Sequence, residues 1–435
     1  MRESGSGTSV LGDPLQSTAQ RLLPSDRLLI ALIFLVPIMK PAVRPPVIAA
    51  DLLFVLLVLV LAAETMLGLR RLYWIPAFPP LLGYVACLAL SLLATSDLGL
   101  SLFKLATEFY LIGLAAVTGF LVDDRRKLRF ALLAWLAAAA VVSLDGLLSL
   151  AAFAIGWPKW LVDYSGFGFD SLPPGPYPRL ALTFFNFNMA CNYLTASLGV
   201  AFVCRKLGYI RRTSFLLIVA GLAIASLSTI SPGLGGMALL GGYLIWIDRG
   251  GFAPRARRAA VSLGVVAAAL FVVALALTPF RHSTATFQID LPGGVTLYPA
   301  PRLLIWIAAF KQFAAHPLVG IGIGIDPVHV GFQSPTGFQL LTDAHNIFLS
   351  IAAQCGVVGL IGLAAVVYLA IASKPSLRIA SAEALSGAAL CATFLNVLLY
   401  QGIGGSFEDT RHIWLLLGLL IGSARAFRMP DQDIA

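Results

Sequence analysis

The sequence predicts an all-α polytopic membrane protein, and three features support this. Hydrophobic residues make up 59% of the 435 residues and charged residues 12%, whereas a soluble globular protein carries about 25% charged residues. Apolar stretches of about 20 residues recur along the chain, which is the length that a helix needs to cross a bilayer. These stretches are continuous, unlike the short alternating strands of a membrane barrel. We therefore expect a helical bundle that folds in lipid.

Twelve such stretches are separated by connections that alternate in basic content. Lysine and arginine gather in every second connection, as in "DDRRKLR" and "PRARR". The positive-inside rule places these connections and both termini in the cytoplasm. The first stretch is interrupted by "KPAVRPP", so the first two could instead form a re-entrant hairpin with the same orientation afterwards. The predicted spans are 28–46, 47–67, 78–95, 101–121, 130–156, 181–203, 214–230, 233–247, 259–279, 346–372, 380–402 and 412–426.

The predicted organisation has four parts. The first 26 residues are polar and rich in Ser, Gly and Pro, with no evident cleavable signal, so a disordered cytoplasmic tail is expected. All five cysteines fall in or beside spans, which supports neither a disulfide framework nor a paired-cysteine metal site. The parts are a tail (1–26), nine spans (27–279), a long outer loop (280–345), and three spans with a short cytoplasmic tail (346–435).

Two outer connections, 157–179 and 280–345, are long, and loops of this length are usually functional. The second contains "RLLIWIAAFKQFAAH", residues 302–316, which has no Gly or Pro and predicts a helix lying at the membrane surface. On a helical wheel Arg302, Ala309, Gln312 and His316 share one side of it, and we expect Arg302 and His316 to face one common space. The alternating glycines of "PLVGIGIGID" follow, and they allow a tight turn or a close backbone approach to a ligand or a helix.

Outward-facing arginines are few, so each is a candidate ligand for phosphate. The planar fork of Arg179 and of Arg302 suits bidentate phosphate binding, although both could instead extend to the membrane interface. For Arg411 a structural role is favoured, at the interface or paired with Glu408 or Asp409.

The stretch "LTDAHNIFLS" puts His345 at the edge of an apolar run. If Asp343 caps the next helix, His345 lies in its first turn. The helix dipole would then lower its pKa and favour the neutral ring, which can accept a proton from a hydroxyl. A structural hydrogen bond is the alternative. The five histidines show no spacing typical of a metal site.

Several of these residues resemble the signature of the O-antigen ligase and polysaccharide polymerase superfamily. The pattern is an Arg–Trp helix, an "hPlxGxG" turn and an "HNxxLxxxxxxGxxGL" segment, and the resemblance covers roughly residues 175–425. An upstream segment, "RLALTFFNFNMACNYL", is also similar. The matching residues are Arg302, Trp306, His316, Pro317, Gly320, Gly322, His345, Asn346, Leu349, Gly356 and Gly359, with Arg179, Asn188 and Tyr193 upstream.

The resemblance implies a GT-C-type membrane glycosyltransferase that needs neither metal nor cofactor. Such enzymes transfer a glycan from undecaprenyl diphosphate at the periplasmic face of the bacterial inner membrane. The acceptor is lipid A–core for a ligase, or another glycan chain for a polymerase. Arg179 and Arg302 would bind the diphosphate, and His345 would activate or position the acceptor hydroxyl. His316, Asn346 and Asn188 would contact substrate.

The chain departs from the family pattern at one position. Family members often carry "SRG" where this chain has Ser-Pro-Gly, so Pro232 replaces an arginine. The main rival interpretation is a secondary transporter or a flippase. Transporter sites lie near the midplane in matching halves, and no such repeat is evident here. The expected partners are the lipid-linked donor, a lipid or glycan acceptor and membrane lipids, and no nucleic acid.

Overall fold

The structure is a computed structural model. It describes residues 22–40, 48–157, 165–167, 177–231, 233–250, 289–291, 295–297, 302–334, 337–374, 381–404 and 410–428. The predicted tail 1–26, most of the 280–301 segment and the predicted span 259–279 lie largely or wholly outside these residues.

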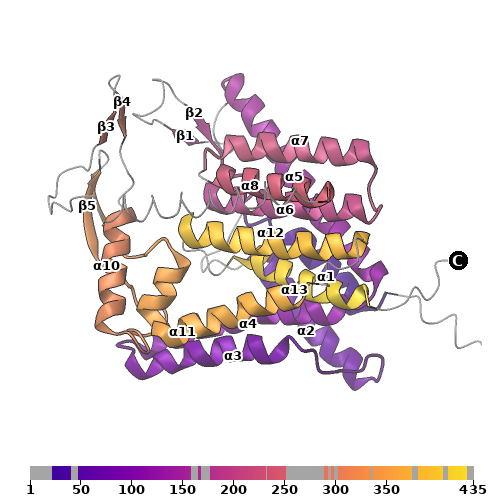
Figure 1. The fold of residues 1–435 in the computed structure, drawn as a ribbon, viewed down its shortest axis with the longest axis horizontal. Coiled ribbons are helices and arrows are strands. Elements are labelled where there is room, and N and C mark those ends of the chain that lie inside the picture. The colour runs from indigo at the N-terminus through magenta and orange to yellow at the C-terminus, as the bar shows by residue number, and fades with distance from the viewer. Residues whose placement is uncertain are drawn as a thin grey trace, which may run out of the picture.

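Helices dominate the described residues, as the sequence predicts (Figure 1). Six of them are long and apolar enough to cross a membrane, and the protein is accordingly a helical membrane protein. The count of twelve spans stays a prediction. The helices are α1 (Pro24–Leu35), α2 (Ala49–Met66), α3 (Phe78–Ala89) with a 3₁₀ turn (Leu90–Ala94), α4 (Leu98–Leu121), α5 (Arg125–Ala154), α6 (Phe187–Lys206), α7 (Arg212–Ser228), α8 (Gly233–Asp248), α10 (Arg302–Ala315), α11 (Ile347–Ala372), α12 (Ala382–Gly404) and α13 (Arg411–Ala426).

The first helix is shorter than predicted. It runs from Pro24 to Leu35, only 12 residues, where the sequence predicted a span over 28–46. Pro37 follows closely and has no backbone N–H to continue the helical hydrogen-bond ladder. The prediction of a full-length first span is therefore wrong for the described part of this segment.

Three small antiparallel hairpins interrupt the helical pattern, and the sequence analysis did not anticipate them. They pair β1 (Ser165–Phe167) with β2 (Tyr177–Arg179), β3 (Ile289–Leu291) with β4 (Val295–Leu297), and β5 (Val330–Ser334) with β6 (Gly337–Leu341). Figure 1 shows these strands and α10 at one end of the bundle, and the end of α13 at the other. We call the end that carries the strands the strand end.

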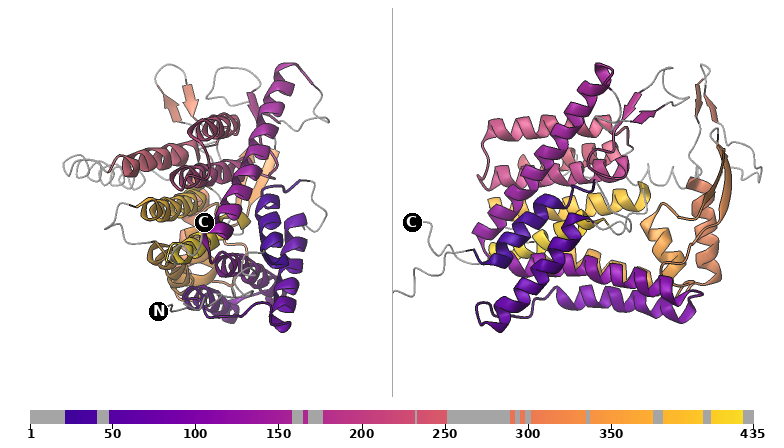
Figure 2. Two further views of the ribbon diagram at one scale, coloured as in Figure 1. Left: turned by 90° about the vertical axis from the view of Figure 1, so that its right-hand side faces the viewer. Right: turned by 180° about the vertical axis from the view of Figure 1, so that it is seen from behind.

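The long α5 crosses the bundle obliquely, as Figure 2 shows from behind. Its 30 residues span about 45 Å at 1.5 Å per residue, more than the hydrocarbon core, so it tilts. Elsewhere small residues allow helices to pack closely, as is typical in membranes. A Cβ added at Gly418 of α13 would lie 2.6 Å from Thr118 Cβ of α4.

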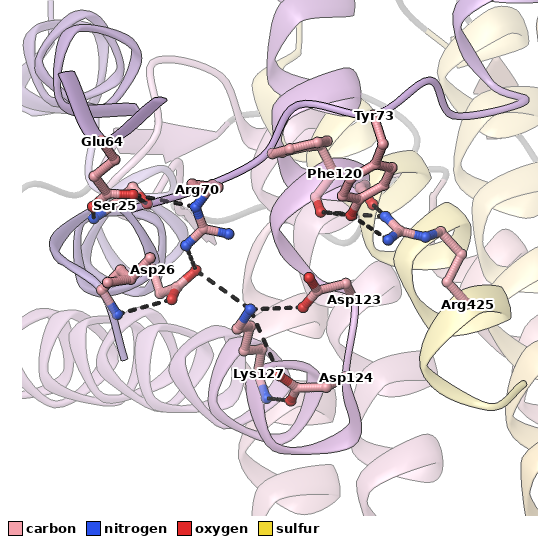
Figure 3. A network of polar contacts seen from close by, with 12 residues as sticks. Ser25, Asp26, Glu64, Arg70, Tyr73, Phe120, Asp123, Asp124, Lys127 and Arg425 are labelled. Atoms are coloured by element: carbon pink, nitrogen blue, oxygen red, sulfur yellow. Dashed lines mark hydrogen bonds and ion pairs between the residues drawn. The ribbon is translucent and has the colours of Figure 1, made fainter. Parts of the chain in front are cut away.

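A buried ionic network joins the first helices at the end opposite the strands (Figure 3). Glu64 accepts hydrogen bonds from Ser25 N at 2.8 Å and Ser25 Oγ at 2.6 Å. Arg70 bridges Glu64 at 3.2 Å and Asp26 at 2.8 Å, and Lys127 Nζ lies 3.9 Å from Asp26. Removing one partner of such a network leaves a buried charge uncompensated. The network therefore holds α1 against α2 and α5.

Candidate functional site

A break inside α11 is filled by the glycine-rich turn that follows α10. Gly356 has φ 65° and ψ −160°, so the hydrogen-bond ladder of the helix is interrupted there. Irregular backbone at membrane depth requires partners within the protein, and the turn supplies them. The bonds are Ile321 N to Ala353 O (3.2 Å), Gly322 N to Gln354 O (2.9 Å), Val357 N to Pro317 O (2.8 Å) and Val358 N to Leu318 O (3.2 Å).

The contact between turn and break has no room for side chains. A Cβ added at Gly320 would lie 2.2 Å from the Gln354 carbonyl carbon, and one added at Gly356 would lie 2.2 Å from Leu318 O. Both a turn and a close approach to a helix, which the sequence offered as alternatives for these glycines, are found: Ile325 N donates to Gly322 O at 3.2 Å within the segment, and its backbone lies against α11. We call this contact the α10–α11 clasp, formed by residues 317–324 and 353–358.

The clasp sets α10 beside the beginning of α11. Ile305 and Ala309 of α10 are buried in one small cluster with Val328 and Ala344. Ile305 lies one helical turn after Arg302, and Ala344 directly precedes His345. The backbone of two predicted site residues is therefore brought to the same region. The helix predicted over 302–316 is confirmed as α10, while the Arg302 side chain lies outside what the structure describes.

The cap of α11 differs from the prediction. Asn346, not Asp343, is the N-cap, and its side-chain oxygen accepts from Leu349 N at 3.1 Å. His345 therefore precedes the helix instead of lying in its first turn. Asp343 binds His345 directly: Oδ1 accepts from His345 N at 3.2 Å, and Oδ2 lies 3.2 Å from His345 Nδ1. Asparagine and aspartate are equally good caps, so propensity did not discriminate between them.

The Asp343–His345 pair has chemical consequences. A carboxylate beside Nδ1 favours the tautomer with the proton on that nitrogen, which leaves Nε2 with its lone pair. The two side chains are 42% and 41% exposed, so the ring is accessible. A carboxylate that orients an imidazole in this way also stabilises the imidazolium after proton transfer. The pair can therefore act as a general base.

Backbone strain concentrates around these candidates. Among the described residues, three other than glycine have positive φ: Leu182 at 55°, Ile230 at 44° and His345 at 47°. Leu182 precedes α6, Ile230 follows α7 and His345 precedes α11, so all three lie at the strand end. Such conformations cost about 1–3 kcal/mol each and cluster at functional sites. The sequence carried no signal for them.

Arg179 is held at the strand end by two contacts. Its Nε donates to Thr229 O at 3.3 Å, and its guanidinium lies over the ring of Phe187. Phe187 begins α6, and Thr229 follows α7. The arginine thus joins β2 to two helices and is half-buried, so its orientation is defined by the fold and not by solvent.

Asn188 belongs to a polar chain that the sequence analysis missed. Ser231 Oγ donates to Asn188 Oδ1 at 2.7 Å and lies 2.7 Å from Tyr400 OH. Because the serine proton goes to Asn188, the tyrosine hydroxyl must donate to Ser231. Asn188 is buried at 7% exposure. The side-chain oxygen of Asn188 accepts a hydrogen bond from within the protein, and contact of this residue with substrate stays a prediction. Pro232 lies outside the described residues.

Arg411 has a structural role, as favoured, but with a different partner. Its Nε lies 2.6 Å from Asp51 Oδ1 and its Nη2 lies 2.8 Å from Asp51 Oδ2. Tyr110 OH also donates to Asp51 Oδ1 at 2.6 Å. Such a fork-to-carboxylate pair is among the strongest of ion pairs. The suggested partners Glu408 and Asp409 lie outside the described residues, and the pair with Asp51 links α13 to α2.

An open cleft with a volume of about 520 Å³ lies beside α10. Gln312 of α10 and His316, which directly follows the helix, both line it. A space common to Arg302 and His316 stays a prediction, because the Arg302 side chain is not described. Asp326 and His329 line it from the segment after the clasp. The remaining lining residues are Ala94, Ser96, Ala308, Ile321, Ile325, Pro327 and Val328. Within the described ranges, no group of three or more His, Cys, Asp or Glu could hold a metal ion.

Part of the chain matches a known protein family. Residues 213–364 match the family model described as O-Antigen ligase, which confirms the resemblance seen in the sequence. No curated protein matches the chain. The matched stretch includes α10, the clasp, Asp343 and His345, whereas Arg179 and Asn188 precede it.

Proposed function

From the match of residues 213–364 to the O-antigen ligase family, we propose that this protein transfers a glycan from undecaprenyl diphosphate to an acceptor hydroxyl. The family implies an O-antigen ligase or polymerase-type glycosyltransferase. Within it we propose the ligase reaction, with lipid A–core as the acceptor, at the periplasmic face of the inner membrane. The strand end would be the periplasmic end.

The proposed reaction is a displacement at the anomeric carbon of the donor. The acceptor oxygen forms a bond to that carbon, the bond from carbon to the diphosphate oxygen breaks, and undecaprenyl diphosphate leaves. His345 Nε2 takes the proton of the acceptor hydroxyl. Asp343 at 3.2 Å from Nδ1 stabilises the positive charge that the ring acquires. No metal is required for this balance of protons and charge.

The observation that carries the proposal is the Asp343–His345 pair at the start of α11. The φ of 47° at His345 costs conformational free energy, and backbone strain of this kind clusters at functional sites. The ring is also exposed and paired with a carboxylate. Its ring needs only to be neutral to act as a base near physiological pH.

Arg179 and Arg302 are proposed to bind the diphosphate. Negative charge on that group grows as the glycosidic bond breaks, so donors fixed in a partly dehydrated site stabilise the transition state most. Arg179 is already oriented by Thr229 and Phe187. Arg302 begins α10, which the clasp sets beside His345. The prenyl tail would deliver the diphosphate to this depth in a fixed orientation.

The test measures single-turnover transfer from a purified lipid-linked glycan to lipid A–core. His345→Ala should lower the rate by about 10²–10⁴ and leave donor binding intact. His345→Gln keeps a polar side chain without basicity, so it should resemble the alanine variant. A Gln variant with the wild-type rate would remove His345 from the chemistry.

Two acceptors separate ligase from polymerase. The ligase proposal expects product on lipid A–core and none when a second lipid-linked glycan is the only acceptor. Product in the second reaction alone would establish a polymerase. The absence of transfer to either acceptor, from a folded protein that does not bind donor, would contradict the proposed function altogether.

A further inference from the structure

We propose that the cleft beside α10 is a saccharide-binding subsite, and this rests on the proposed glycan transfer. The open cleft is bordered by α10, by the segment after the clasp and by the 3₁₀ turn with its connection to α4. Its volume of about 520 Å³ lies within the range of about 300–1,000 Å³ that is typical of ligand sites. Arg179 and His345 are not among its described lining residues, whereas His316, a predicted substrate contact, is. The side chain of Arg302 lies outside what the structure describes.

The polar side chains in the cleft have unused hydrogen-bonding capacity. Those of Gln312, His316, Asp326 and His329 have no hydrogen-bond or ion-pair partner among the residues that the structure describes. Together they offer an amide, a carboxylate and two imidazoles, which supply both donors and acceptors. A ligand rich in hydroxyl groups could use both kinds.

The apolar part of the lining completes the match to a sugar. Ile321, Ile325, Pro327 and Val328 supply apolar lining beside the polar groups. Pyranose rings present C–H faces as well as hydroxyls, so they suit a site with apolar walls and a few convergent polar groups. Ligands of purely apolar character, such as a prenyl chain, would leave four polar side chains without partners.

The charge of the lining argues against a diphosphate. Among the described side chains that line the cleft there is neither lysine nor arginine, and Asp326 contributes a carboxylate. An anionic group placed there would meet a like charge and, among those side chains, no fixed cation. The cleft is therefore suited to an uncharged part of a substrate, and the diphosphate would bind elsewhere.

The position of the cleft connects it to the reaction centre. Val328 lines the cleft and also packs in the cluster with Ala344, the residue before His345. Ala308 and Gln312 of the cleft belong to the helix that begins at Arg302. Saccharide units held in the cleft would therefore extend along α10 toward the start of α11.

The first test compares Gln312→Ala and Asp326→Asn with Lys311→Ala, a control at the exposed neighbouring position outside the cleft. Donor and acceptor concentrations are varied separately. Each cleft variant should raise one KM about threefold to tenfold, the effect of one lost hydrogen bond, with kcat nearly unchanged. A rise in the acceptor KM assigns the cleft to the acceptor glycan, and a rise in the donor KM assigns it to the donor glycan. If both KM values stay at the control level, the subsite is wrong.

A second test does not depend on catalysis. Ser96 lines the cleft and is exposed, so Ser96→Cys provides a thiol for maleimide labelling in a background that lacks the five native cysteines. The free oligosaccharide of the donor or acceptor should slow labelling, and inorganic diphosphate should not. Equal labelling with and without saccharide would overturn the proposal. Protection by saccharide in a protein without transferase activity would separate failure of the proposed function from failure of the subsite.

Discussion

Gly356→Ala is the sharpest single perturbation of the site, because it acts on the clasp without touching a proposed catalytic group. At φ 65° and ψ −160° the residue occupies a region that is essentially restricted to glycine, and forcing another residue there costs about 1–3 kcal/mol. The added Cβ would also lie 2.2 Å from Leu318 O and 2.7 Å from Val319 N. Both are backbone atoms, so the turn itself must move.

Movement of the turn breaks hydrogen bonds. The two nearest are Val357 N to Pro317 O at 2.8 Å and Val358 N to Leu318 O at 3.2 Å. Each of these two hydrogen bonds contributes about 0.5–1.5 kcal/mol, and the conformational strain adds about 1–3 kcal/mol. The free energy of unfolding should therefore fall by about 2–6 kcal/mol in total. Groups left unsatisfied at membrane depth would add to this cost.

The assay combines thermal denaturation in detergent with single-turnover transfer. We expect Gly356→Ala to lower the melting temperature. We also expect transfer to fall by more than the loss of folded protein explains, since α10 is released from the start of α11. Gly83→Ala is the matched control. It lies in α3 with nothing within 4 Å of the added Cβ, so its stability should be unchanged or slightly raised. A Gly356→Ala protein as stable and active as the Gly83→Ala protein would refute the role of the clasp.

Further predictions concern the clamp, the topology and the polar chain. Lysine at Arg179 or Arg302 keeps the charge but loses the planar fork, so transfer should fall sharply while the protein folds; normal rates for both variants would exclude bidentate binding. Cysteines introduced at the exposed positions Lys311 and Thr213 should react with impermeant reagents from the periplasmic and cytoplasmic sides respectively, and labelling from one side only would contradict the alternating topology. Ser231→Ala removes the hydrogen bonds of this hydroxyl with Asn188, Tyr400 and Gly233 N and should cost about 1–3 kcal/mol, measured as a lower melting temperature; an unchanged melting temperature would show that the chain contributes little.

The sequence determined the class of the protein because lipid imposes a simple rule. A chain with this share of apolar residues must form helices that satisfy their own backbone groups, and the boundaries of α4, α8 and α11 follow the apolar stretches closely. The helix from Arg302 was also predictable, since fourteen residues without Gly or Pro have local reasons to be helical. His345 could be singled out because a titratable side chain at the edge of an apolar run is costly.

Contacts between distant segments were decided only by the tertiary structure. The pairing of Arg411 with Asp51 joins residues 360 positions apart, and no local pattern distinguishes Asp51 from the nearer carboxylates. Asn346 caps α11, while Asp343 contacts His345 instead, and local propensity does not separate two residues that cap equally well. The glycines of the turn were visible in the sequence, but the break in α11 that receives them was not. That break is stable only because the turn supplies its missing hydrogen-bond partners, and those partners come from another part of the chain.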